Sequence, residues 1–455
     1  MRILLWHGYL LAGSGSNLYT ANIARVWRSE GHEVLLMCQE RDAADFEFVD
    51  EQGDFAPDNR SFTLEPAGAR TARGLCRVAR PFIGGLLPVY VYDEYEGFSV
   101  KRFVDLTDSE LNSYTKFNVD ALAAAIEKFR PSALITGHEV MGPFIALQAQ
   151  RLTGHDYVAK LHGSALEYAV KEQPRYVRFA QEGLSGAKVV TGGSNYMVRE
   201  ASSVISGWED RAEVVNPGCD IGLFKPPRQR SNQVPVVGYV GKFIASKGIH
   251  HLLAAAGLVG HRMRLEIIGY GGFQSQLRAL WEALRSADEN AVADIARRGD
   301  GRPLPDLLEW LRFGGMDQSF RAHIGAVECS WPGRLDHGPL SKRLPEFDVL
   351  VVPSVVPEAF GMVAAEAAAC AVLPVVPSHS GIGEVGAAIE EAFDRPGWLT
   401  YDPADPIRGI AGVLDRLLEM TPGERFELGL AAAELARERW SWEHVADQLL
   451  ELAIR

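Results

Sequence analysis

The sequence predicts an α/β protein made of two Rossmann-like βαβ domains that face each other across a cleft. Short apolar runs rich in valine, isoleucine and leucine recur along the chain, and each is followed by a glycine-containing turn and then a helical pattern. Such runs, without alternating polar residues, are typical of parallel strands buried on both faces. The series restarts after a proline- and charge-rich stretch at residues 224–230, which is typical of a linker. At 455 residues, the chain is also too long for one ordinary core.

The predicted strands divide the chain into two domains. In the first domain we expect strands at residues 3–6, 33–38, 133–136, 157–161 and 188–191. In the second we expect them at residues 234–240, 265–268, 349–352 and 372–376. The first domain then spans residues 1–218 and the second 219–440, and the tail is helical with a break at 440–443. We interpret two long turn-rich segments, at about 67–113 and 281–322, as insertions that carry their own helices.

Composition and charge exclude several classes of function. Lysine and arginine total 46 against 59 aspartate and glutamate residues, a formal net charge of −13, which is unfavourable for a non-specific nucleic-acid or anionic-membrane binder. Five scattered cysteines without a C-x-x-C pair favour a reducing, cytoplasmic location over a disulfide or zinc framework. No apolar run is long enough to span a bilayer. We therefore expect no transmembrane segment, and any membrane contact would be peripheral.

The most informative window lies at residues 353–370. A predicted strand ends here, Glu358 lies in the loop that follows, and an alanine-rich helix begins near Phe360 or Gly361. The free N–H groups of a first helical turn and the helix dipole favour an anion, and glycine lets a phosphate approach the backbone closely. Glu358 and Glu366 could then hydrogen-bond sugar hydroxyls on either side of that phosphate. The alternative is that Glu358 only caps the helix and that Glu366 is a solvated or paired helical residue.

Two lysines follow the first predicted strand of the second domain. Lys242 comes directly after Gly241, and Lys247 lies five residues further on, before a helix predicted at 248–256. Two ammonium groups at the carboxyl end of a strand suit a diphosphate, and local positive charge is scarce in an acidic chain. The alternative is a pair of surface lysines at a turn.

Histidines and glycines occupy the loops after the first-domain strands. His162 directly follows one predicted strand, and His138 holds the equivalent place after the preceding strand. Each could donate a hydrogen bond to a substrate oxygen, or could be purely structural. Gly13 and Gly15 follow the first strand, but Leu18 stands where the dinucleotide fingerprint G-x-G-x-x-G requires its third glycine. An NAD site is therefore not predicted, although the loop amides could still approach a phosphate or sugar.

The densest basic cluster lies in the first insertion. Its members are Arg70, Arg73, Arg77 and Arg80, a spacing that would place them on one face of a helix. The hypothesis is that this face receives an anionic acceptor, such as a phosphorylated or carboxylated sugar, or an anionic lipid surface. The alternative is a solvated face paired with Asp93, Glu94 and Glu96.

Taken together, these windows resemble the retaining glycosyltransferases of family 4, nucleotide-sugar enzymes with the GT-B fold. The paired glutamates and the lysine pair are the specific part of the resemblance. One departure is Lys242, because the family usually has arginine there and lysine lacks its bidentate geometry. The matching segments run in family order: 13–15 with 31–34, 161–163, 192–195, 215–224, 241–248, 265–272, 348–354 and 358–366.

The resemblance implies a donor site in the second domain, and a C-terminal helix at 441–455 that crosses back and completes the first domain. Glu366 would bind the ribose, Glu358 the hydroxyls of the donor sugar, and His162 would lie near the transferred sugar, so that Glu358 and His162 are the expected catalytic residues. The residues implied for donor binding are Gly15, Gly241, Lys242, Lys247, Phe360, Gly361, Met362, Val363 and Glu366. The possible acceptor residues are Gly13, His138, Arg73 and Arg77.

The implied function is transfer of a sugar from a nucleoside-diphosphate sugar to an acceptor hydroxyl with retention of anomeric configuration. A UDP-sugar is favoured and a GDP-sugar comes second, and the acceptor would be a sugar, a glycoside or a lipid-linked molecule. We expect no cofactor and no metal, because lysines and helix amides would stabilise the departing diphosphate. The alternatives are a GT-B phosphorylase or sucrose- or trehalose-type enzyme, and a non-catalytic nucleotide-binding protein of the same fold.

Overall fold

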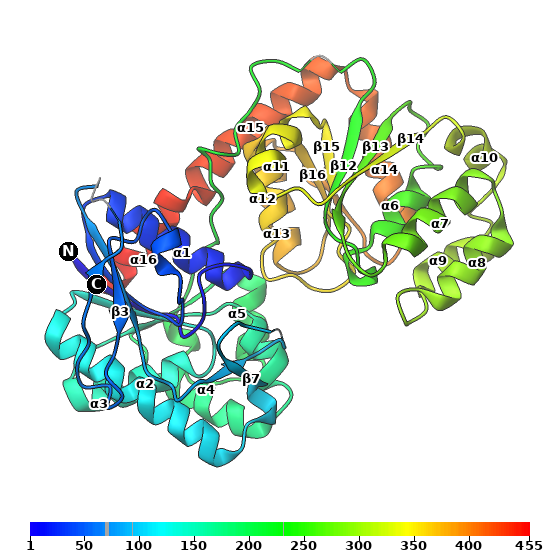
Figure 1. Ribbon diagram of the computed structural model, residues 1–455. Coiled ribbons are helices and arrows are strands. Elements are labelled where there is room, and N and C mark those ends of the chain that lie inside the picture. Colours follow the sequence, from blue (N-terminus) through cyan, green and yellow to red (C-terminus); the bar gives the residue numbers. More distant parts are fainter. Residues whose placement is uncertain (69–71, 93, 231) are drawn as a thin grey trace. The chain divides into compact units, whose positions relative to one another are not determined.

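The computed structural model describes residues 1–68, 72–92, 94–230 and 232–455 and divides into two compact units (Figure 1). The first unit consists of Met1–Pro217 with Trp442–Arg455, and the second of Gly218–Ser441. These boundaries lie within one residue of the predicted ones. The stretch at 224–230, interpreted above as a linker, instead lies inside the second unit.

Among the described residues, the first unit is built on a nine-stranded sheet in which only β4 runs antiparallel to its neighbour. The central strands are buried on both faces, as their apolar sequences predict. A separate two-stranded parallel sheet pairs β6 (Leu86–Val89) with β7 (Ser99–Arg102). In spatial order the main strands are β11 (Ala212–Val214), β10 (Val189–Gly192), β9 (Val158–Lys160), β8 (Ala133–Gly137), β1 (Arg2–Trp6), β2 (Glu33–Met37), β5 (Leu75–Arg80), β3 (Glu51–Asp54) and β4 (Glu65–Pro66).

Helices connect the strands of the first unit, and capping side chains fix where several of them begin. The Ser14 side chain accepts a hydrogen bond from the Asn17 amide, which satisfies one free donor at the start of α1. The α-helices are α1 (Gly15–Ser29), α2 (Asp108–Phe129), α3 (Gly142–Thr153), α4 (Pro174–Gly186), α5 (Asn195–Ser202) and α16 (Trp442–Ile454). Short helices of other types are η1 (Ala43–Asp45), η2 (Phe103–Asp105), η3 (Leu166–Val170) and η4 (Glu209–Arg211).

The C-terminal helix α16 returns to the first unit, as predicted. The indole Nε1 of Trp27 in α1 donates to the Ala446 carbonyl at 3.2 Å. Trp442 meets the ring of Tyr19 edge-on, with centroids 5.5 Å apart. Trp27, Tyr19 and Trp442 are all buried, so α16 completes the hydrophobic core of this unit.

The prediction that the arginines of the first insertion lie on one face of a helix is wrong. Within the described part of 67–113 the chain forms β5, β6 and β7, and α2 begins only at Asp108. β5 lies between β2 and β3 in the main sheet. Because side chains alternate along a strand, Arg77 and Arg80 lie on opposite faces. Arg73 is exposed in the bend before β5, and Arg70 lies outside the described residues.

Both strand arginines pair with carboxylates of neighbouring strands. Arg77 contacts Glu51 at 3.0 Å and Glu33 at 3.2 Å, and Arg80 contacts Asp54 at 2.6 Å. Glu51 and Asp54 of β3 lie directly opposite Arg77 and Arg80, whereas Glu33 of β2 is a diagonal neighbour of Arg77, and both kinds of cross-strand pair interact. Arg77 and Arg80 thus pair with carboxylates of β2 and β3. Asp93, one of the acidic partners suggested from local sequence beside Glu94 and Glu96, lies outside the described residues.

The second unit is built on a six-stranded sheet in which all neighbours are parallel. In spatial order its strands are β14 (Glu328–Gly333), β13 (Arg264–Tyr270), β12 (Val236–Lys242), β15 (Val349–Val351), β16 (Leu373–Pro377) and β17 (Thr400–Tyr401). The insertion at 281–322 does carry helices of its own, α8 to α10. The helices are α6 (Ile249–Ala255), α7 (Gln274–Arg285), α8 (Glu289–Arg298), α9 (Pro305–Arg312), α10 (Gln318–Ile324), α11 (His337–Arg343), α12 (Met362–Ala369), α13 (Ser380–Ala392), α14 (Pro406–Glu419) and α15 (Pro422–Trp440), with η5 (Ala245–Lys247) and η6 (Leu344–Glu346).

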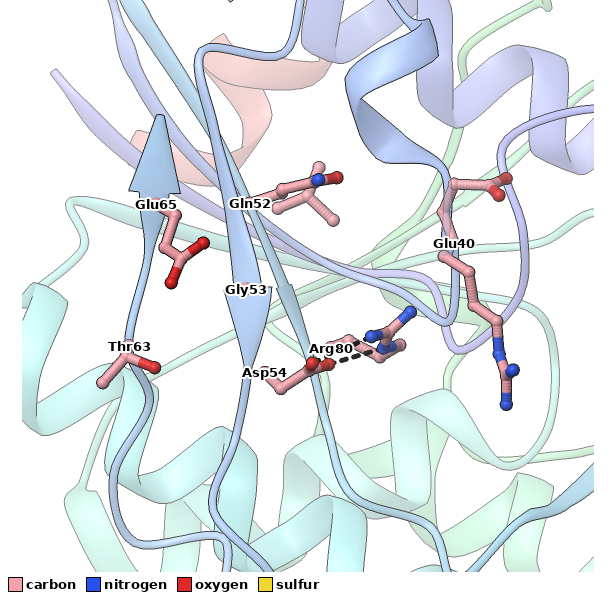
Figure 2. Close-up of a pocket in the computed structure, with 9 residues that line it drawn as sticks. Glu40, Gln52, Gly53, Asp54, Thr63, Glu65 and Arg80 are labelled. Carbon is pink, nitrogen blue, oxygen red and sulfur yellow. Dashed lines mark hydrogen bonds and ion pairs between the residues drawn. The ribbon is translucent and has the colours of Figure 1, made fainter. Parts of the chain in front are cut away.

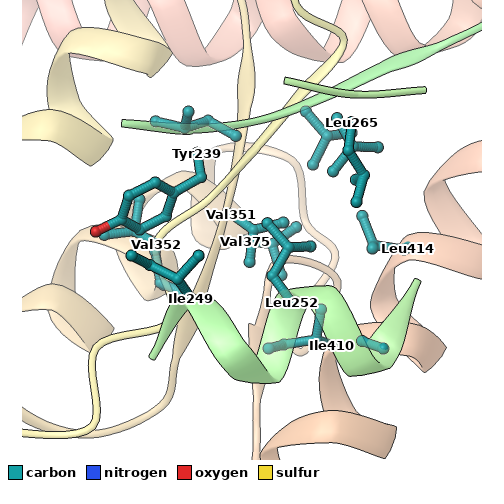
Figure 3. Close-up of a cluster of buried hydrophobic side chains, with 14 of the residues drawn as sticks. Tyr239, Ile249, Leu252, Leu265, Val351, Val352, Val375, Ile410 and Leu414 are labelled. Atoms are coloured by element: carbon teal, nitrogen blue, oxygen red, sulfur yellow. The ribbon is translucent and has the colours of Figure 1, made fainter. Parts of the chain in front are cut away.

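The core of the second unit fixes the central strands. Val351 of β15 and Val375 of β16 pack in one buried cluster with Leu252 of α6 and with Ile410 and Leu414 of α14 (Figure 3). Complete burial of such a side chain is worth roughly 1.5–3 kcal/mol relative to exposure. The loops that leave the carboxyl ends of these strands therefore start from rigid positions. No helix within the described residues is long and apolar enough to cross a membrane.

Candidate functional site

Two loops of the second unit meet at the carboxyl edge of its sheet. One follows β12 and contains Lys247, and the other follows β15 and contains Glu358. Because β12 and β15 are neighbours in the sheet, both loops leave the same edge. The Val355 amide donates to the Ser246 carbonyl at 2.9 Å. Gly248 adopts φ +67°, and a Cβ there would lie 1.8 Å from the Pro353 carbonyl oxygen, so this close approach requires glycine.

Lys247 and Glu358, both predicted site residues, form an ion pair in this structure. The Nζ of Lys247 lies 2.6 Å from Oε1 of Glu358, and the side chains are 32% and 16% exposed. The Ser354 hydroxyl donates to the same carboxylate oxygen. α12 has no side-chain cap hydrogen bond, so the alternative that Glu358 merely caps the helix is wrong. The lysine and carboxylate are instead held together beside the start of α12.

Ser380 and His379, which the sequence analysis missed, hold the loop at Glu358 and Ser354 by hydrogen bonds. The Glu358 amide donates to the Ser380 hydroxyl oxygen at 3.0 Å. Nε2 of His379 lies 3.2 Å from the Ser354 carbonyl, and Nδ1 lies 2.9 Å from the Ser380 hydroxyl. Since a carbonyl oxygen can only accept, the geometry places a ring proton on Nε2. His379 comes two residues after β16, so the strand-end rule used for Lys247 could have found it.

Gly361 sets the start of α12. It occupies the N-cap with φ +97°, in the left-handed region that favours glycine. Phe360 before it is buried and meets the Trp440 ring edge-on at 5.8 Å. Met362 and Val363, the first helical residues, are half-buried. The Ala364 amide donates to the Gly361 carbonyl at 3.0 Å. The amides of Met362 and Val363 have no acceptor within a helix that starts here, so they can bind an anion.

Replacing Gly361 with alanine is expected to lower the free energy of unfolding by about 1–3 kcal/mol, because the residue would adopt a strained backbone. The added Cβ would also lie 2.7 Å from the Ile382 side chain. Chemical denaturation measures the change. The matched control is Gly412→Ala in α14, where a Cβ meets nothing within 4 Å and where alanine is the better helix former. Equal stability of the two variants would contradict the strain assigned to Gly361.

Glu366 lies inside α12 and is buried, so it is not a solvated helical glutamate, whereas the alternative of a paired one agrees with its contact to His337. Its Oε1 is 3.7 Å from Nε2 of His337 in α11. Glu366 raises the pKa of His337 above its ordinary value, mainly through this contact. The sequence analysis missed His337, which lies four residues after β14, because it did not predict that strand.

Gly241 and Lys242, the other residues predicted to bind the donor from this side of the sheet, end β12. Lys242 is exposed at the end of β12, and its carbonyl accepts from the Tyr239 hydroxyl at 2.9 Å. Gly241 precedes it and is half-buried. Among the residues that the structure describes, the ion pair of this edge is made by Lys247 rather than Lys242.

The predicted histidines of the first unit cluster at the carboxyl ends of β8, β9 and β1. The ring of His138 lies 4.9 Å from that of His162 and 5.7 Å from that of His7. Within the described part of the chain, neither ring nitrogen of His138 has a hydrogen-bond partner. Burial, and then the neighbouring His138, Lys160 and His7, lower the pKa of His162 well below its ordinary value. His162 is therefore neutral near pH 7, so its ring has one nitrogen that donates a hydrogen bond and one that accepts.

Two buried ionisable side chains lie next to these histidines and were missed by the sequence analysis. Lys160 in β9 donates from Nζ to the Val215 carbonyl at 2.5 Å and lies 5.1 Å from the centre of the Tyr19 ring. Glu139 accepts from the Gly163 amide at 2.7 Å, and burial raises its pKa to about 7. A cavity of about 10 Å³ lies between Tyr19, Lys160 and His162, which is enough for one water molecule.

The stability of the protein should depend on pH through Lys160. Burial lowers the pKa of Lys160 to about 7, whereas an unfolded lysine titrates near about 10.4. Between these values the unfolded chain binds more protons, so Lys160 disfavours folding less as pH rises. The wild type should therefore gain stability relative to Lys160→Met as pH rises. The Tm of the variant minus the Tm of the wild type should fall from about pH 7 to about pH 10. Calorimetric scans of both proteins measure it, and a constant difference would contradict the burial effect.

The glycine loop after β1 is open. Gly13 adopts φ +93°, Gly15 is the first residue of α1, and both are exposed with free space around them. α1 in turn holds His7, whose Nε2 lies 2.9 Å from Asn17 Oδ1.

Across the described residues, no group of three or more histidine, cysteine, aspartate or glutamate side chains could hold a metal ion.

Comparison with known families finds two matches in this chain. Residues 14–218 match the sequence model of the glycosyl transferase 4-like domain, and residues 318–424 match that of the glycosyl transferases group 1. Together the matches cover more than half of the chain. A D-inositol 3-phosphate glycosyltransferase from Thermomonospora curvata is 28% identical over 316 residues, which are 65% of this chain and 63% of the relative. The chain thus spans less than two thirds of the length of the curated relatives it matches first.

Solved structures with the same fold extend over the whole chain. A sucrose-phosphate synthase from Thermosynechococcus elongatus has a TM-score of 0.61 at 20% identity, covering 99% of this chain and 98% of that one. HepE of Anabaena, solved in complex with UDP, has a TM-score of 0.60 at 14% identity and covers 99% of both chains. At these identities the likeness concerns the fold, and it confirms the predicted GT-B architecture.

Proposed function

Because this chain belongs to glycosyltransferase family 4 and has the GT-B fold, we propose that it transfers a sugar from a nucleoside-diphosphate sugar to an acceptor hydroxyl. We further propose that the anomeric configuration is retained and that no metal is required. The observation that carries the proposal is the Lys247–Glu358 ion pair beside the N-terminus of α12, with Glu366 buried within that helix.

In this proposal the second unit binds the donor. Lys247, Lys242 and the first amides of α12 bind the diphosphate, where negative charge increases as the bond to the sugar breaks. Preorganised positive groups aimed at that charge lower the barrier, and here they take the place of a metal ion. Glu366 accepts hydrogen bonds from the ribose and Glu358 from the donor sugar. His162, neutral near pH 7, forms a hydrogen bond with the transferred sugar.

UDP is the favoured nucleotide. HepE of Anabaena, which shares the fold, was solved with UDP. Thermal-shift measurements with UDP, GDP, ADP, NAD and inorganic phosphate test this directly, since a ligand that binds only the folded state raises Tm. We expect UDP to give the largest increase and NAD none. An increase with NAD or with phosphate alone would contradict a nucleoside-diphosphate donor.

A further inference from the structure

The first unit contains a pocket at the carboxyl ends of β2, β5 and β3 (Figure 2). It has a polar part of about 230 Å³ and an aromatic part of about 530 Å³. The two parts share Arg41, Asp54 and Arg80, so they adjoin. We call the two together the edge pocket. The Glu40 carboxylate accepts from the Leu11 amide at 3.0 Å, which ties this pocket to the loop that contains Gly13.

Carboxylates outnumber guanidinium groups in the polar part. Glu40, Asp54 and Glu65 line it, against Arg41 and Arg80. Arg80 is engaged by Asp54 through two bonds, Nε to Oδ1 at 2.6 Å and Nη2 to Oδ2 at 2.8 Å (Figure 2). A guanidinium bound by both oxygens of one carboxylate offers little attraction to a further anion.

The second arginine is also engaged. Nη2 of Arg41 donates to the Gly97 carbonyl at 2.6 Å, and its guanidinium lies 4.5 Å from the centre of the Phe98 ring. The polar part therefore has a net negative lining, and placing a phosphate or carboxylate there brings like charges together, which is unfavourable.

The aromatic part supplies an apolar wall. Phe55, Phe82, Ile83 and Phe98 line it, and Phe82 is 38% exposed. A pocket with apolar walls and a few polar groups that fix orientation is typical of small-molecule sites. Carboxylates, Gln52 and Thr63 in the polar part are acceptors and donors suited to hydroxyl groups.

We propose that the edge pocket binds the acceptor and that this acceptor is an uncharged, hydroxyl-rich molecule with an apolar face or aglycone, such as a neutral glycoside. This inference rests on the proposed function. It replaces the anionic acceptor predicted from Arg73 and Arg77, because Arg77 is paired across the sheet and Arg73 does not line the pocket. It also sets this chain apart from the relative named for an inositol phosphate.

The test uses matched probes that differ by one anionic group. These are p-nitrophenyl glucoside against p-nitrophenyl glucuronide, glucose against glucose 6-phosphate, and myo-inositol against inositol 1-phosphate. Saturation-transfer NMR on the full chain with UDP present compares binding within each pair. We expect the neutral member to bind at least tenfold more tightly and p-nitrophenyl glucoside to bind most tightly. Tighter binding of the anionic members, or no binding of any neutral member, would overturn the inference.

Two variants locate the effect. Glu65→Lys should reduce the preference for the neutral probes at least tenfold, whereas Glu47→Lys, which changes an exposed carboxylate outside the pocket, should leave it unchanged. Phe82→Ala should weaken the binding of p-nitrophenyl glucoside more than the binding of glucose. Equal effects of the two lysine variants would overturn the assignment to this pocket. UDP calorimetry on the same samples separates the failures: a chain that binds UDP but prefers anionic probes loses only this inference, whereas one that does not bind UDP loses the proposed function as well.

Discussion

Lys247→Ala is expected to lower kcat/KM by about 10- to 300-fold, which corresponds to roughly 1.5–3 kcal/mol for one lost charge-assisted contact in the transition state. In the structure the ammonium group is held 2.6 Å from Glu358, so it is already positioned when the donor arrives. In the proposed reaction it stabilises the departing diphosphate, and its loss should therefore lower kcat.

Steady-state kinetics with the UDP-sugar selected by the nucleotide screen measure this loss, and far-UV circular dichroism checks that the variant is folded. The matched control is Lys342→Ala, which removes an exposed lysine of α11 in the same unit and should leave kcat/KM unchanged. Activity of Lys247→Ala within twofold of the wild type would remove Lys247 from the site.

Glu366→Ala is expected to weaken the binding of free UDP about tenfold or more, because a buried carboxylate that accepts ribose hydroxyls is lost. Isothermal titration calorimetry measures the affinity. Glu366 also raises the pKa of His337, so NMR titration of the His337 ring should show this pKa fall in the variant, which confirms that the contact was removed.

Glu358→Ala should act differently, because Glu358 is assigned to the donor sugar and not to the nucleotide. Free UDP should bind nearly as tightly as to the wild type, while kcat falls. The carboxylate is also the partner of Lys247, so its loss does not remove the positive charge that the diphosphate meets. If UDP affinity responds equally to the Glu358 and Glu366 changes, the assigned roles are wrong.

The parallel-sheet core could be predicted from sequence because each central strand is an uninterrupted apolar run. The first insertion could not. β5 places arginines among apolar residues, and the same spacing fits one face of a helix. What decides between them is pairing with Glu33 and Asp54, which lie 44 and 26 residues from Arg77 and Arg80. The spacing of neighbouring residues carries no information about partners so far away along the sequence.

The candidate site was partly predictable for a related reason. Lys247 and Glu358 are 111 residues apart, yet both follow strands of one parallel sheet, and the carboxyl ends of such strands share an edge. The same rule applies to His379 and Ser380 after β16. It could not find His337, because β14, the strand before it, was not predicted from the sequence. Nor does it apply to Lys160, which lies within a strand and could be placed only by its buried contacts.

Calorimetric titration with UDP and with uridine in the presence of EDTA tests the central claim most directly, since the claim is a metal-independent diphosphate site built from Lys247 and the start of α12. We predict that UDP binds without divalent metal, that uridine binds at least tenfold more weakly, and that Lys247→Ala reduces the difference between the two. UDP binding that requires added Mg²⁺, or equal affinities of the wild type and Lys247→Ala for UDP, would contradict the account.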